Sequence, residues 1–159
     1  MSVKPVLVLG WGNRSRGDDA LGPMCVGALQ SQLTQDLVPW VDFLDDYQLQ
    51  VEFALDLVGR QAVLFIDASV NCEPPFQALT VQARRDSSLS SHALTPQALL
   101  QVFADLQGEP GPAATLLAIR GEAFGLGLPL SALAQAHLNA ATRWAQDWLA
   151  QTLLEQQHA

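Results

Sequence analysis

The chain has 159 residues, of which 49% are hydrophobic and 15% charged, a composition that excludes an intrinsically disordered protein. Sixteen Asp and Glu against eight Lys and Arg give a net charge of -8, which disfavours nucleic-acid or anionic-membrane partners. No stretch approaches the ~20 apolar residues of a membrane span. Only two cysteines are present, Cys25 and Cys72, and they predict reduced thiols in a cytoplasmic protein. We expect one domain over residues 1–159.

Short apolar runs alternate with helically spaced apolar residues through the first half of the chain. The runs predict strands buried on both faces, as in a parallel sheet. The helical spacings predict crossover helices, the second of them ending at Gly59. In chain order the predicted elements are a strand at Val6–Leu9, a helix at Ala20–Leu33, a strand at Val38–Leu44, a helix at Gln48–Val58 and a strand at Ala62–Ile66.

The second half continues the alternation after a turn-rich break. Thr95 followed by Pro96 is a helix start, and Gly108 marks the end of that helix. Ser131 starts a long terminal helix, for which the spacing predicts one shared face of Leu133, His137, Ala140, Trp144 and Trp148. The remaining predicted elements are an edge strand at Phe76–Ala83 and a last strand at Ala114–Ile119. The pattern predicts an α/β three-layer sandwich with a twisted, mostly parallel sheet of about five strands and helices on both faces.

Three polar residues fall at one predicted edge of this sheet. Asp19 closes the loop after the first strand, Asp67 follows the central strand, and His92 lies in the loop before the Thr95 helix. Sites in open α/β sheets form beyond the carboxyl ends of the strands. Two carboxylates and an imidazole brought together there would suit a mid-row divalent metal. Each also has a plainer interpretation: Asp19 as a helix cap, Asp67 as a turn residue and His92 as a loop residue.

Other chemistries fit the sequence less well. Gly10-Trp11-Gly12 begins like a dinucleotide-binding loop, but Ser15 stands where the third glycine would be. This argues against a nicotinamide or flavin, and we expect no organic cofactor. A serine nucleophile would need a G-x-S-x-G elbow, which the sequence lacks. A phosphate site at the Gly10–Asp19 loop is opposed by the acidic pair at its end.

The segment from Gly10 to Pro23, GWGNRSRGDDALGP, resembles the opening signature of the hydrogenase maturation proteases. The resemblance continues through Phe65-Ile66-Asp67-Ala68, Ser91-His92 and the Gly121–Gly125 segment, and covers almost the whole chain. Members of this family remove a short C-terminal extension from the large subunit of nickel-iron hydrogenases. The resemblance implies an α/β sandwich and an endopeptidase whose partner is the hydrogenase large-subunit precursor.

The resemblance also implies roles for particular residues. Asp19, Asp67 and His92 match the metal-binding and catalytic trio of the family, which is thought to contact nickel already installed in the substrate. Many relatives carry a glycine-containing segment after the second strand, where this chain has Asp45-Asp46-Tyr47-Gln48. The glutamine-containing version is similar to the branch that serves cytoplasmic, NAD-linked hydrogenases. Substrate binding is then assigned to Asp45, Asp46, Gln48 and Arg16, with Arg16 guiding acidic groups of the substrate.

Two functional alternatives remain open at this point. The metal could be catalytic, or it could be only a recognition element while Asp19 or Asp67 acts as general base. The chain could also be a non-catalytic, metal-sensing binding module or chaperone for the same precursor. Arg14 and Arg16 could alternatively pair with Asp18.

Overall fold

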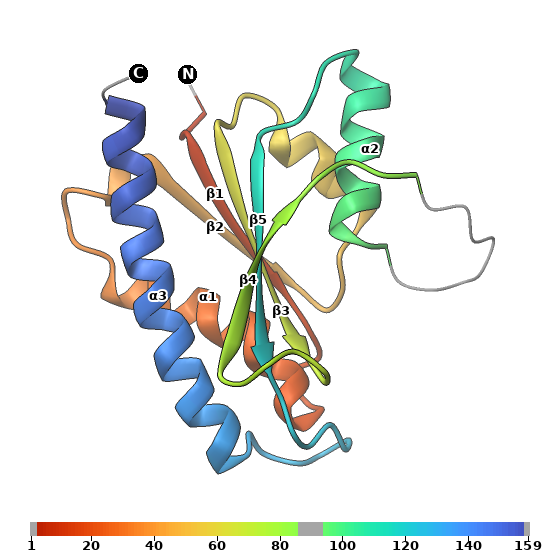
Figure 1. The fold of residues 1–159 in the computed structure, drawn as a ribbon, viewed down its shortest axis with the longest axis vertical. Helices are drawn as coiled ribbons and strands as arrows, with labels where there is room; N and C mark the ends of the chain where they lie inside the picture. Colours follow the sequence, from red (N-terminus) through yellow and green to blue (C-terminus); the bar gives the residue numbers. More distant parts are fainter. Residues whose placement is uncertain (1–2, 86–93, 158–159) are drawn as a thin grey trace.

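A five-stranded sheet runs through the centre of the computed structural model, which describes residues 3–85 and 94–157. The strand order is β2-β1-β3-β5-β4, and β1, β2, β3 and β5 are parallel while β4 pairs antiparallel with β5 at the edge. Figure 1 shows the four parallel strands running in one direction through the molecule. The strands are β1 (Val6–Trp11), β2 (Val41–Asp46), β3 (Ala62–Ser69), β4 (Phe76–Val81) and β5 (Ala113–Arg120).

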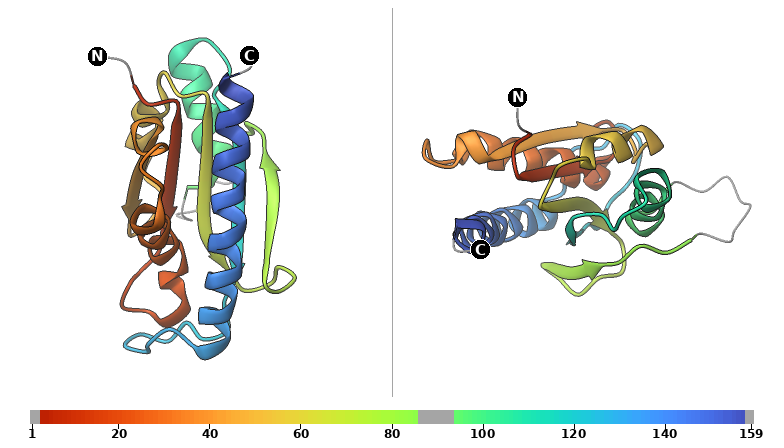
Figure 2. Two further views of the ribbon diagram at one scale, coloured as in Figure 1. Left: turned by 90° about the vertical axis from the view of Figure 1, so that its left-hand side faces the viewer. Right: turned by 90° about the horizontal axis from the view of Figure 1, so that it is seen from above.

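Helices cover both faces of this sheet, so the predicted three-layer α/β sandwich is confirmed. Helices α1 and α3 lie on one face, and α2 with the 3-10 helix η3 lies on the other (Figure 2). The α-helices are α1 (Leu21–Gln32), α2 (Pro96–Gln107) and α3 (Ala132–Gln157), and the 3-10 helices are η1 (Gly17–Ala20), η2 (Val38–Trp40) and η3 (Val51–Leu57). None of the described helices is both long and apolar enough to cross a membrane.

Alternate residues of each central strand belong to two separate cores. Val6 and Val8 of β1 pack toward α1 and α3, whereas Leu7 and Leu9 pack toward α2 and η3. All four are fully buried, as expected for a strand covered on both faces. This explains why the strand reads as a continuous apolar run rather than as an alternation.

The helix starts follow local chemistry closely. Thr95 Oγ1 accepts a hydrogen bond from the Ala98 amide at 3.1 Å, and α2 ends at Gly108, which has a left-handed φ of 71°. Ser131 Oγ likewise accepts from the Ala134 amide at 3.2 Å at the start of α3. Both predicted caps are therefore confirmed.

Three expectations need correction. The segment before Val41 is the 3-10 helix η2 rather than strand, because Pro39 has no amide to donate to a sheet ladder. The predicted helix at Gln48–Val58 is the shorter 3-10 helix η3. The strand before Asp67 does not stop there, since β3 continues to Ser69.

The buried face of α3 also differs from the expected one. Leu133 is 60% exposed, and Trp144 and Trp148 pack only partly against the core. The face that meets the sheet is offset by one position and consists of Ala134, Leu138, Ala141, Ala145, Leu149 and Leu153. Small alanines let the helix lie close to the sheet and α1, and the larger indole rings are left at the margins.

The carboxyl ends of the parallel strands meet at one edge of the sheet, the lower end in Figure 1. The loop after β1, the segment between β5 and α3, and the first turn of α3 all lie at this edge. Sheets of this type place their sites there.

Candidate functional site

Asp19 lies in η1, immediately after the loop that follows β1. Its side chain is half-buried, and Oδ2 accepts a hydrogen bond from the Asn13 amide at 2.7 Å. The interpretation of Asp19 as a helix cap is wrong, because the N-cap of α1 is Ala20 and no side chain caps that helix. The carboxylate instead bonds back to its own loop.

The same loop is shaped by Gly12, whose φ of +149° lies in a region that side chains rarely adopt. A Cβ added at Gly12 would collide with the backbone carbonyl oxygen of Asp19. The tight return of the chain toward Asp19 therefore requires glycine at this position.

Asp67 lies within β3, opposite Ala118 of β5 in the sheet register. Burial raises the pKa of its carboxyl to about 7, and the neighbouring Asp19 carboxylate also acts to raise it. Hydrogen bonds with the Ala68 amide and the Trp11 side chain act in the opposite direction without outweighing the burial. The result is an acid that changes its protonation state near neutral pH, a property typical of functional carboxyl groups.

The Asp19 carboxylate, in η1 after β1, thus lies close enough to Asp67 of the neighbouring strand β3 to influence its charge. His92, the third residue of the predicted trio, lies outside the described residues. Within residues 3–85 and 94–157, no three His, Cys, Asp or Glu side chains gather closely enough to hold a metal ion. The predicted trio as a whole therefore stays a prediction.

The predicted substrate-binding acids close β2, where Asp45 lies opposite Gly10 and Asp46 lies opposite Trp11. Asp45 pairs with the Arg14 guanidinium at 3.1 Å. The carbonyl oxygen of Asp46 accepts from the Gly12 amide at 3.0 Å. These links tie the end of β2 to the loop that carries Asp19.

A hollow of about 310 Å³ opens at this junction. It is lined by Gly12, Arg14, Asp45, Asp46 and Tyr47. Two larger hollows, of about 450 and 410 Å³, lie away from the acidic edge, one at the amino ends of β3 and β5 and the other between α1 and α3. Proximity to Asp19 rather than size makes the smaller hollow the relevant one.

Gln48 and Arg16 are exposed at the same edge. Gln48 lies between β2 and η3, and Arg16 precedes η1. The carbonyl oxygen of Arg16 accepts from the Asp19 amide at 3.1 Å, so its backbone helps to shape the loop. Their roles toward a substrate remain predictions.

Solved structures of known proteins share this arrangement. HybD from E. coli, a hydrogenase maturating endopeptidase, matches with a TM-score of 0.73 at 23% identity, over 96% of this chain and 94% of that one. The hydrogenase 2 maturation peptidase of a Thaumarchaeota archaeon matches with a TM-score of 0.65 at 26% identity, over 92% and 98%. HycI from Thermococcus kodakarensis, a [NiFe] hydrogenase maturation protease, matches with a TM-score of 0.71 at 18% identity, over 93% of each chain.

This is the fold of the hydrogenase maturation proteases. No protein-family model matches the chain, and no curated protein sequence matches it. The likeness nevertheless spans more than nine-tenths of this chain in each of the three structures. The resemblance inferred from the sequence is thereby confirmed at the level of fold.

Sequence reasoning missed the role of Asp18, the most buried polar residue among those that the structure describes. Asp18 is fully buried, and its carboxylate accepts hydrogen bonds from the segment between β5 and α3 rather than from an arginine. The alternative that Arg14 pairs with Asp18 is wrong, since Arg14 pairs with Asp45, and Arg16 is exposed. Two adjacent aspartates at a predicted helix start look alike in a sequence, because the partners of Asp18 lie more than 100 positions away.

Trp11 is the second residue that sequence reasoning missed. It ends β1, is 8% exposed, and its side chain acts to lower the pKa of Asp67. Its ring also meets Phe65 edge-on, with centroids 6.0 Å apart. The available signal was its place between Gly10 and Gly12 at a strand end, where a bulky residue can face the site.

Proposed function

We propose that this chain is an endopeptidase that removes a C-terminal extension from the large-subunit precursor of a nickel-iron hydrogenase after nickel insertion. The observation that carries the proposal is the interacting Asp19–Asp67 pair at the carboxyl edge of a fold shared with maturation proteases. Two acids from different elements, Asp19 of η1 and Asp67 of β3, one of them with a pKa near neutrality, are the kind of groups that hydrolysis of a peptide bond requires.

Nickel enters this proposal as part of the substrate. Two neighbouring carboxylates repel each other, and burial further disfavours the ionised form of Asp67. A divalent cation placed between them would remove both penalties. Oxygen donors from Asp19 and Asp67, completed by the imidazole of His92, suit a mid-row metal ion. A bound metal would polarise the scissile carbonyl or activate water.

Asp67 can contribute in a second way that needs no metal contact. A carboxyl group with a pKa of about 7 is present in both protonation states at neutral pH. It can therefore accept a proton from an attacking water and return it to the leaving amine. In that arrangement nickel would serve as a recognition element, and Asp67 would act as the general base.

The precursor would approach over the hollow beside β2. Asp45, Asp46 and Arg14 line it, with the exposed Tyr47 at its edge, and Gln48 follows directly in the chain. We assign substrate contact to this surface because it adjoins the loop that carries Asp19. We also propose that the protein acts in the cytoplasm, consistent with the free, buried thiols of Cys25 and Cys72.

The test is intact-mass analysis of nickel-loaded precursor after incubation with the protein. We expect loss of one C-terminal peptide with the wild type, and no loss with Asp19→Ala, Asp67→Ala or His92→Ala. Asp105→Ala is the matched control, because Asp105 is an exposed acid on α2 that pairs with Arg85. It should process the precursor normally.

Two results would contradict parts of the proposal. An unchanged precursor mass despite a stable complex would make the protein a binding module or chaperone. Equally fast cleavage of nickel-free and nickel-loaded precursor would remove nickel from the reaction and leave a metal-independent endopeptidase.

A further inference from the structure

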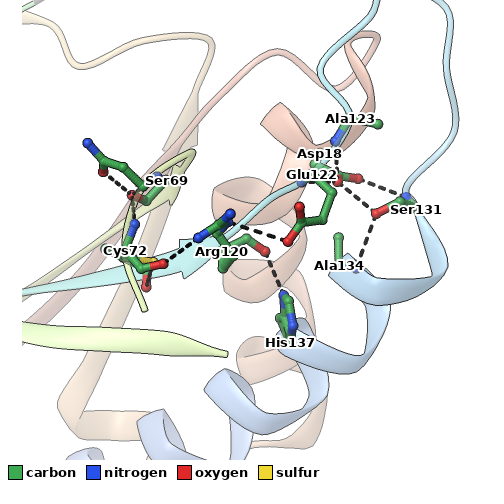
Figure 3. Close-up of polar contacts among 11 residues, drawn as sticks. Asp18, Ser69, Cys72, Arg120, Glu122, Ala123, Ser131, Ala134 and His137 are labelled. Atoms are coloured by element: carbon green, nitrogen blue, oxygen red, sulfur yellow. Dashed lines mark hydrogen bonds and ion pairs between the residues drawn. The ribbon is translucent and has the colours of Figure 1, made fainter. Parts of the chain in front are cut away.

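The carboxylate of Asp18 joins two parts of the chain that are distant in sequence. Oδ2 accepts from the amides of Glu122 and Ala123 at 2.7 and 2.9 Å and from Ser131 Oγ at 2.7 Å. Oδ1 accepts from the Ser131 amide at 2.8 Å. Figure 3 shows these donors converging on the one side chain. We call Asp18 with these three partners the Asp18 clamp.

Asp18 is fully buried, and its carboxylate accepts four hydrogen bonds. Burial by itself disfavours a charged group strongly, and hydrogen bonds from neutral donors offset that cost only when their geometry is good. None of the ion pairs found among the described residues includes Asp18. Its charge is therefore held by oriented backbone and hydroxyl dipoles, an arrangement that fixes position.

Backbone hydrogen bonds reinforce the clamp on both sides of Asp18. The Gly17 amide donates to the Leu128 carbonyl at 3.1 Å, the Asp18 amide to the Ala123 carbonyl at 2.7 Å, and the Gly127 amide to the Ser15 carbonyl at 2.7 Å. Gly17 has a φ of +54°, and an added Cβ would collide with the carbonyl oxygen of Ala123. The two segments are thus held in close backbone contact directly before Asp19.

A second branch leads from the clamp toward β3. Glu122 forms an ion pair with Arg120, with Oε1 and Nε 3.4 Å apart. Arg120 Nη1 donates to the Cys72 carbonyl at 2.8 Å, and the Cys72 amide donates to Ser69 Oγ at 3.1 Å (Figure 3). Ser69 ends β3 two positions after Asp67. The segment held by Asp18 therefore connects both to η1, which carries Asp19, and to β3, which carries Asp67.

We infer that Asp18 is a positioning residue for the Asp19–Asp67 pair. Its clamp fixes the backbone from which the Asp19 side chain projects, while the Asn13 amide holds the Asp19 carboxylate itself. This inference rests on the proposed function for its catalytic consequence, but the positional claim stands on the contacts alone. Peptide-bond chemistry depends on such placement, since a shift of about 1 Å can cost ~100-fold in rate.

The experiment measures hydrogen exchange of the Asn13 amide by NMR in the full-length protein, because this amide reports whether the Asp19 carboxylate stays in place. We expect Asp18→Asn to accelerate its exchange roughly tenfold, since an amide nitrogen cannot accept the clamp donors. Ser131→Ala removes one hydroxyl and should show a smaller acceleration. Ser131→Thr keeps the hydroxyl and should restore protection.

Asp42→Asn is the matched control. Asp42 pairs with Arg60 in the first half of β2, far along the strand from the acidic edge, so its loss perturbs stability without touching the clamp. It should leave Asn13 exchange at the wild-type rate once global unfolding is accounted for. If Asp18→Asn fails to fold, the Ser131 pair of variants decides the question.

Precursor cleavage is the second measurement. We expect kcat to fall about 100-fold for Asp18→Asn with KM little changed, as for misplaced reacting groups. Unchanged Asn13 exchange in the folded Asp18→Asn and Ser131→Ala proteins would overturn the positioning role, and so would unchanged kcat. If the wild type cleaves no precursor, the proposed function fails, yet the exchange result still decides whether Asp18 positions Asp19.

Discussion

Asp67 should make the stability of this protein fall as the pH rises toward neutrality. Burial raises the pKa of its carboxyl from 3.8 to about 7 in the folded protein. Between these two values the folded protein holds a proton that the unfolded chain releases. Stability therefore declines as the pH rises through this window, and the full cost is present above about pH 7.

The magnitude follows from the same displacement of the pKa. A difference of this size corresponds to about 4 kcal/mol at most, and access of water to the half-buried side chain reduces the expected value to about 2–4 kcal/mol. Asp67→Asn removes the ionisation while keeping the shape. The variant should match the wild type near pH 4 and be more stable at pH 8 by this amount.

Urea denaturation at pH 4.5, 6 and 8, followed by tryptophan fluorescence, measures the difference directly. Asp105→Asn is the control, because Asp105 is an exposed acid whose pKa is lowered by its hydrogen bond from Arg85. It should show no gain in stability at pH 8. A separate NMR titration should find the pKa of Asp67 lower in Asp19→Asn, because the Asp19 charge helps to raise it.

A raised pKa for Asp67 would be refuted if the free energy of unfolding of Asp67→Asn differed from that of the wild type by the same amount at pH 4.5 and at pH 8. It would also be refuted by a variant that is less stable than the wild type at pH 8. Either result would mean that Asp67 is ionised in the folded protein at little cost, and it would lose its suitability as a general base at neutral pH.

Further outcomes follow from single contacts. Thr95→Ala should lower the free energy of unfolding by about 1 kcal/mol in urea titrations, through loss of the α2 cap. Gly17→Ala should cost more than about 1–3 kcal/mol, because the left-handed φ of +54° alone costs that much and the added Cβ would also collide with the Ala123 carbonyl oxygen. Arg14→Ala should change stability by less than about 1 kcal/mol, since its pair is exposed, but should raise KM for the precursor. The pKa of Asp18 is lowered, since its four hydrogen bonds outweigh burial. The ionised carboxylate therefore stabilises the fold above about pH 4, and this stabilisation is lost below it. In urea titrations, the free energy of unfolding of Asp18→Asn should fall less on acidification below about pH 4 than that of the wild type.

Much of the fold could be predicted because short stretches of the sequence determine where its strands and helices begin and end. The buried strand β1, the capped start of α2 and the start of α3 depend on apolar runs and on side chains that bond within three or four positions. The order of these elements then implies a parallel sheet, because parallel strands need crossover helices. The family resemblance rests on the same kind of local signal, in the segment from Gly10 to Pro23.

Errors arose where neighbours in space decide the outcome. The spacing in α3 is compatible with several faces, and the choice of the alanine-containing face depends on how closely the helix approaches the sheet and α1. The spacing after Gln48 correctly predicted a helical segment, but this segment is the seven-residue η3, a 3-10 helix rather than an α-helix. This segment packs against α2, a contact that the local spacing does not reveal.

The sequence by itself determined the elements, their order, and the edge of the sheet at which Asp19 and Asp67 lie, since strand ends are set by local hydrophobicity and turns. The sequence also singled out Asp19 rather than Asp18, but only the tertiary structure shows the physical reason for the difference. Asp18 turns inward because donors more than 100 positions away stabilise its charge, and Asp19 is left to interact with Asp67. Environment also decided the chemistry, because the pKa of a carboxyl depends on the burial and charges around it rather than on its own covalent structure.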